Sequence, residues 1–209
     1  MDPHYRSRLI AVVIIMIAVC SAFSVSPVAG FRLENRDGSG TGATLAEALV
    51  MQESTKIKEV FLENVTVYID SRSSKFEEYR NTSLEKHVNG VYCPEEDAIY
   101  LRSDINPEKA DETLVQQLGH RLYIQQGLAG SDILASLSPN PDSYLSRLCE
   151  RPGDVTGEEV FANAFMLYHT SPDVLQMDDP AIYTYIDLFV KAGGDAAAAD
   201  DLYRHYEPE

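Results

Sequence analysis

The stretch from Thr113 to Leu122 constrains the fold of this chain most, because it has the periodicity of an amphipathic helix. Its apolar residues share one stripe: Leu114, Val115, Leu118 and Leu122. Gln116 and His120 stand one turn apart on another face, with Gln117 beside them. We therefore expect a helix with one face buried in the core and a polar face turned toward a cleft.

The elements around this stretch predict an α+β fold, with a few strands first and helices afterwards. In the N-terminal half we expect a helix over 43–53, a strand-like segment over 58–70 with a turn at Glu63–Asn64, a helical turn over 74–80, and a hairpin of 88–92 with 98–101. In the C-terminal half we expect helices over 107–126, 131–137, 142–150, 157–168, 180–192 and 195–206.

The N-terminal segment has the pattern of a targeting sequence. Arg6 and Arg8 precede an apolar run over residues 9–19, which predicts a signal peptide or signal anchor over residues 1–30. The glycine-rich segment 31–42 is expected to be a flexible linker, followed by one globular domain over residues 43–209. The domain is then extracytoplasmic, either secreted or anchored to the cell membrane by the N-terminal segment.

The charge of the chain excludes some classes of partner. Lys and Arg number 17 against 33 Asp and Glu, for a net charge of −16. A surface this acidic repels phosphate groups, so we expect no nucleic-acid binding and a membrane contact only through the N-terminal segment.

Two cysteines follow the targeting segment, Cys93 and Cys149. In an exported domain such an even pair is a candidate disulfide, although two separate buried thiols are the alternative. Neither cysteine has a neighbouring cysteine or histidine at zinc-site spacing.

The polar face of the predicted helix over 107–126 matches the layout of a zinc-protease helix. In the pattern His-Glu-x-x-His, two histidines bind the metal and the glutamate acts as general base. Here Gln116 stands at the first ligand position, Gln117 at the base position and His120 at the second ligand position. Glu159, on the predicted helix over 157–168, is a candidate for the third ligand.

The region from Val88 to about Ile186 resembles the zinc metalloprotease domain of the anthrax toxin lethal factor family. The signature His-Glu-Phe/Leu-Gly-His of that family corresponds to residues 116–120, and its Glu-Phe-Phe-Ala-Glu-Ala-Phe helix corresponds to residues 159–165. The resemblance implies a zincin-like fold, zinc bound by His120 and Glu159, and a hairpin strand that pairs with substrate. That strand would be Ala98, Ile99, Tyr100 and Leu101.

Several functional positions depart from the family pattern. Besides Gln116 and Gln117, Asn163 stands where the family has a second glutamate on the later helix. An amide binds zinc poorly and cannot take a proton from water. We therefore expect no cofactor, with weak residual zinc at His120 and Glu159 left open. The expected function is non-catalytic binding of a peptide or protein; an active metallopeptidase with an atypical ligand set and a purely structural surface protein are the alternatives.

Overall fold

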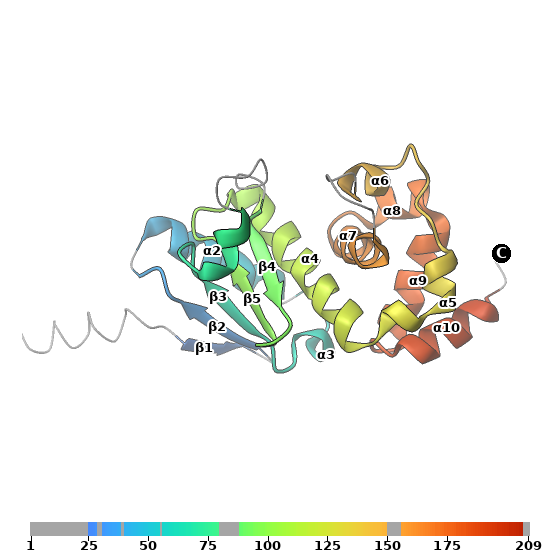
Figure 1. Cartoon of the computed structure of the whole chain (residues 1–209), viewed down its shortest axis with the longest axis horizontal. Coiled ribbons are helices and arrows are strands. Elements are labelled where there is room, and N and C mark those ends of the chain that lie inside the picture. Colours follow the sequence, from blue (N-terminus) through green and yellow to red (C-terminus); the bar gives the residue numbers. More distant parts are fainter. Residues whose placement is uncertain are drawn as a thin grey trace, which may run out of the picture.

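The computed structural model describes residues 25–28, 31–38, 40–54, 56–79, 88–149 and 156–206. The fold is mixed α+β, with a small sheet on one side, a group of helices on the other, and helix α4 between the two (Figure 1). The prediction of a signal peptide or anchor falls mainly on residues 1–24 and 29–30, which lie outside the described residues.

The sheet has five strands in the order β1-β2-β3-β5-β4: β1 Val25–Val28, β2 Phe31–Asn35, β3 Thr66–Ile69, β4 Gly90–Cys93 and β5 Ala98–Leu101. The three central strands are parallel, whereas β1 and β4 lie antiparallel at the two edges. The predicted hairpin is confirmed as β4 and β5, joined by a turn in which Asp97 has a φ of 46°.

The prediction that Ala98, Ile99, Tyr100 and Leu101 form an accessible edge strand is wrong. These residues form β5, which pairs with β3 on one side and with β4 on the other, and all four are buried. The backbone N–H and C=O groups of a central strand are already hydrogen-bonded to its two neighbours. An extended peptide therefore cannot pair with β5. The edge strand of the hairpin is β4.

The α-helices are α2 Thr41–Ser54, α3 Glu59–Leu62, α4 Pro107–Gln125, α5 Asp132–Ser136, α6 Tyr144–Cys149, α7 Gly157–Thr170, α8 Pro172–Asp178, α9 Pro180–Lys191 and α10 Ala196–Arg204. Two 3-10 helices, η1 Ser74–Tyr79 and η2 Leu128–Gly130, accompany them. Of the described helices, none combines the length and apolar character that a membrane crossing requires.

Two elements differ from the sequence-based expectations in the N-terminal half. Residues Glu59–Leu62, expected as part of a strand, form helix α3, in which Phe61 and Leu62 are buried. The prediction of a flexible linker is wrong for Phe31–Asn35, which form β2. Phe31 and Leu33 alternate with polar residues and are 4% and 0% exposed, so one face of this strand belongs to the core.

The core divides between the two faces of the sheet. Ile69, Ile99 and Leu101 contribute to the larger cluster, which continues through α2 and α4 into the helical half. Side chains alternate between the two faces of a strand, so Ala98 and Tyr100 of β5 point to the face opposite Ile99 and Leu101. There they contribute to a smaller cluster together with Phe76 of η1. The sheet thus has one face joined to the main core and one face covered by a small satellite cluster.

Candidate functional site

The two segments that carry the predicted motifs, α4 and α7, pack against each other at very short range. A methyl group added to Gly119 would lie 2.7 Å from the Cα of Ala162 and 3.0 Å from its carbonyl oxygen. Only a glycine permits this approach. Polar side chains of both helices are therefore brought together along one interface.

Gln116 belongs to a chain of hydrogen bonds between these helices. Its side-chain Nε2 donates to Asn163 Oδ1 at 3.0 Å. Asn163 Nδ2 in turn donates to the Glu159 carbonyl oxygen at 2.9 Å and lies 3.3 Å from its carboxylate Oε2. Asn163 is 2% exposed, so this chain is part of the interior of the protein.

Gln117 is bound to the edge strand of the sheet. Its Oε1 accepts a hydrogen bond from the backbone N–H of Tyr92 in β4 at 2.7 Å. Gln117 is 7% exposed. It also packs closely on Gly90 of β4, because a Cβ added to this glycine would lie 3.2 Å from the Gln117 Cγ. The Gln117 amide therefore satisfies a buried backbone donor of β4.

His120 pairs with Glu158. Its Nδ1 lies 2.8 Å from Glu158 Oε1, and the two side chains are 14% and 36% exposed. Sequence reasoning assigned the metal-ligand role to Glu159 and missed Glu158. The signal that identifies Glu158 is helical phase, because it lies four residues before Ala162, on the face that meets Gly119.

The polar groups at this interface include two side chains of types that bind zinc in proteins, those of His120 and Glu158. A zinc site needs at least three protein ligands. Within the described residues, no cluster of three or more His, Cys, Asp and Glu side chains is placed to hold a metal ion. His120 and Glu158 are two donors, and the amide of Gln116 is held by Asn163.

The prediction of a Cys93–Cys149 disulfide is wrong, since the two cysteines are buried thiols that are not bridged to each other. Cys149 lies at the end of α6, with its Sγ 3.8 Å from Asn163 Nδ2. Cys93 lies in β4 and contacts Lys75. The two thiols belong to separate clusters of the core, which an even cysteine count does not reveal.

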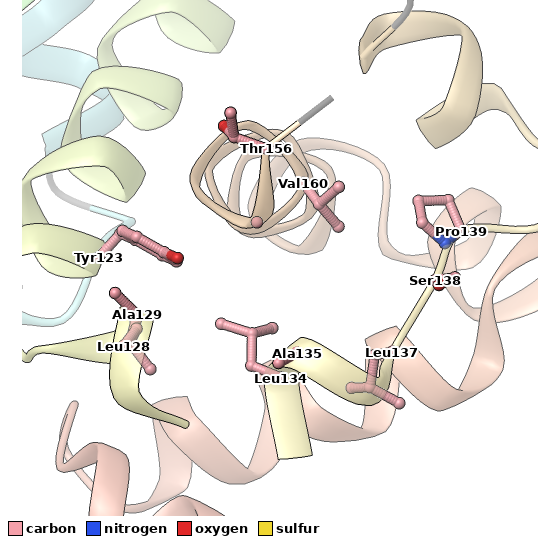
Figure 2. Close-up of a pocket in the computed structure, with 11 residues that line it drawn as sticks. Tyr123, Leu128, Ala129, Leu134, Ala135, Leu137, Ser138, Pro139, Thr156 and Val160 are labelled. Carbon is pink, nitrogen blue, oxygen red and sulfur yellow. The ribbon is translucent and has the colours of Figure 1, made fainter. Parts of the chain in front are cut away.

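A cavity of about 500 Å³ lies between the end of α4, α5 and the start of α7 (Figure 2). Its lining comes from the end of α4, η2, α5, the segment after α5 and the start of α7: Tyr123, Leu128, Ala129, Leu134, Ala135, Leu137, Ser138, Pro139, Thr156, Gly157 and Val160. Most of these side chains are apolar, and the Tyr123 hydroxyl is a polar group at the wall. Burial and the nearby charge of Glu158 raise the pKa of Tyr123.

Neither the models of protein families nor the curated proteins contain a match to this chain.

Proposed function

We propose that this chain is an exported or membrane-anchored, zincin-like domain without protease chemistry, which binds a peptide or protein segment in its former substrate cleft. The observation that carries the proposal is the use of both substituted motif positions, Gln116 and Gln117, for internal hydrogen bonds. A zincin-like architecture is supported by the parallel sheet with its antiparallel edge strand β4 beside α4.

The loss of metal binding follows from the chemistry of Gln116. Its side-chain nitrogen is an NH₂ group with no free lone pair for a metal. This group donates a hydrogen bond to Asn163 Oδ1. A remaining pair of donors, His120 and Glu158, would bind a divalent ion weakly and without selectivity.

The loss of hydrolysis follows from Gln117. A neutral amide cannot accept the proton of an attacking water, and the removal of such a group lowers a hydrolytic rate by about 10²–10⁴. The side-chain carbonyl oxygen of Gln117 also accepts a hydrogen bond from the Tyr92 N–H. At this position the side chain therefore holds the edge strand β4.

The cavity between α4, α5 and α7 suits an apolar side chain of a bound segment. Its volume of about 500 Å³ and apolar wall fit one large hydrophobic residue. Glu158, which follows the lining residue Gly157, is partly exposed, and the whole chain has a net charge of −16. These charges favour a segment in which a hydrophobic residue is flanked by Lys or Arg.

Metal content tests the loss of protease chemistry. We would measure zinc by mass spectrometry in the purified chain and in the Gln116→His/Gln117→Glu variant. The expected result is a native chain without bound zinc and a variant that takes up about one zinc per chain. Stoichiometric zinc in the native chain, or chelator-sensitive cleavage of a peptide library by it, contradicts the proposal.

A peptide library with hydrophobic residues flanked by Lys or Arg tests the binding site itself. Ala135 is exposed and lines the cavity, so Ala135→Trp fills the cavity without disturbing the core. We expect this variant to lose at least tenfold in affinity for the selected peptides. Ala197→Trp, on an exposed position of α10, is the matched control and should bind as the native chain does. Equal losses in both variants, or none in either, contradict a site in this cavity.

A further inference from the structure

A second pocket, of about 370 Å³, lies beside the edge strand β4 and the helix η1. Its lining is Ser74, Lys75, Val91, Tyr92, Cys93, Pro94 and Glu95. The Cys93 side chain belongs to the satellite cluster on the face of the sheet opposite the main core. The pocket gives a small solute a way to a thiol that is otherwise only 4% exposed.

The Cys93 thiol is held between an amine and a carboxylate. Lys75 Nζ lies 3.0 Å from Cys93 Sγ, and the thiol donates to Glu95 Oε2 at 3.2 Å. Lys75 also forms an ion pair with Glu96, with Nζ 2.7 Å from Oε1. Hydrogen bonds to Glu96 and Cys93 raise the pKa of Lys75, so its ammonium form is favoured next to the sulfur.

We propose that Lys75 and Cys93 form a site of oxidative modification, in which hydrogen peroxide that enters the pocket converts the pair into a covalent sulfur–nitrogen cross-link. The short distance between Nζ and Sγ carries this proposal, together with the pocket that both residues line. It is independent of the proposed peptide binding.

The first step is oxidation of the Cys93 sulfur. The thiol proton passes to the Glu95 carboxylate that accepts its hydrogen bond, and the resulting thiolate is the nucleophile. The sulfur attacks one peroxide oxygen, so that an S–O bond forms and the O–O bond breaks. The leaving hydroxide takes a proton from the Lys75 ammonium and departs as water. Sulfur is oxidised, peroxide is reduced, and the products are Cys93 sulfenic acid and the neutral Lys75 amine.

The second step is condensation. The lone pair of Lys75 Nζ attacks the sulfur of the sulfenic acid, an S–N bond forms and the S–O bond breaks. The hydroxide leaves with one proton of the amine as a second water, which gives a sulfenamide without further oxidant. Lys75 is 30% exposed and has a flexible stem, so the nitrogen can close the remaining distance to the sulfur without a shift of the backbone.

The cross-link would tie η1 to β4, two elements from separate parts of the sequence. Thiols reduce sulfenamides, so the modification is reversible. The edge strand β4 would be covalently attached to η1 under oxidising conditions and released under reducing ones.

Peptide mapping of the full-length chain after brief treatment with hydrogen peroxide tests the proposal. Trypsin cannot cleave after a cross-linked Lys75, so residues 73–80 should appear joined to residues 87–102. The joined species should be about 2 Da lighter than the sum of its parts and should separate on treatment with dithiothreitol.

Two variants separate the roles of the lysine. Lys75→Arg keeps the positive charge but has no amine that can become neutral, so Cys93 should be trapped by dimedone as sulfenic acid without a cross-link. Lys75→Met removes the charge as well, and the rate of Cys93 oxidation should fall at least tenfold. The proposal is overturned if native Cys93 resists peroxide, if it proceeds to sulfinic acid without the joined peptide, or if it pairs with another cysteine.

Discussion

Arg121 is the buried charge on which the junction between the sheet and α4 depends. It is 5% exposed, and its guanidinium binds both carboxylate oxygens of Asp97 at 2.7 and 3.0 Å. It also donates to the carbonyl oxygens of Phe61 and Glu63. One side chain of α4 thus ties together the β4–β5 turn and the end of α3, with its hydrogen bonds directed at fixed acceptors.

Asp97→Asn should destabilise the fold by about 3 kcal/mol, because removal of one partner leaves a buried charge without its counter-ion. Asparagine tolerates the positive φ of this position, so the turn itself is preserved. Urea unfolding measures the effect, with Asp104→Asn as control, since Asp104 pairs with Arg102 at an exposed site. The control should change stability by less than about 1 kcal/mol. Equal changes in the two variants would contradict the role of Arg121.

His169 makes the stability of the helical half sensitive to acid. Its Nε2 is buried and has no hydrogen-bond partner among the described residues, and its ring packs against Phe165 and Tyr168. Burial, together with the charge of Lys58, lowers the pKa of His169 to about 4 from the ordinary 6.5. Between these two pKa values, His169 is protonated in the unfolded chain but not in the folded chain. The free energy of unfolding therefore decreases as the pH falls through this window.

His169→Phe removes this titration and keeps an aromatic ring in the same packing. Denaturant unfolding between pH 8 and pH 4 should show a free energy of unfolding that decreases less steeply in the variant than in the native chain. At pH 8 the two slopes should coincide, because histidine is then almost entirely neutral in both states. Parallel curves over the whole range would show that another group causes the acid sensitivity.

At the level of elements, the α4–α7 interface depends on the absence of a side chain at Gly119. Gly119→Ala places a methyl group against the backbone of Ala162, and such overpacking costs about 1–3 kcal/mol. This outweighs the gain of about 1 kcal/mol that alanine has over glycine within a helix. Gly130→Ala is the matched control, because nothing lies within 4 Å of the added atom. A native-like melting temperature for Gly119→Ala would contradict the close approach.

The helices that carry the site could be predicted from sequence because their signals are local. Pro107 at the first position and the apolar stripe of α4 place that helix within one residue of its observed end. Residues 172–178 carry a comparable start signal in Pro172, but the segment is only seven residues long and too short for a periodic stripe, so the sequence does not predict α8. Short apolar runs are ambiguous for a different reason, as Glu59–Leu62 illustrate, since burial alone does not distinguish a strand from a helix.

Pairings between distant residues could not be predicted from sequence. The sheet order, which puts β4 rather than β5 at the edge, follows from the docking of β5 on β3. The choice between Glu158 and Glu159 as partner of His120 follows from the rotation of α7 about its axis. Each depends on how elements pack, and a single sequence does not encode packing in any local pattern.

At the scale of the whole molecule, the net charge of −16 opposes folding through repulsion between carboxylates. Ion pairs such as Lys109–Glu112 and Arg32–Glu34 are local and largely exposed, so they offset little of this repulsion. Added salt shortens the Debye length from about 30 Å at 0.01 M to about 8 Å at 0.15 M. Screening therefore weakens the long-range repulsion more than it weakens contacts between adjacent charges.

The chain should accordingly gain stability with salt. Between 0.01 and 0.15 M sodium chloride we expect the melting temperature to rise by about 2–4 °C, which corresponds to about 1 kcal/mol for a chain of this size. Equal ionic strength from potassium chloride should give the same rise, since screening does not depend on the identity of the cation. A rise specific to one cation would point to a bound ion, and a fall in melting temperature would mean that the surface ion pairs outweigh the repulsion.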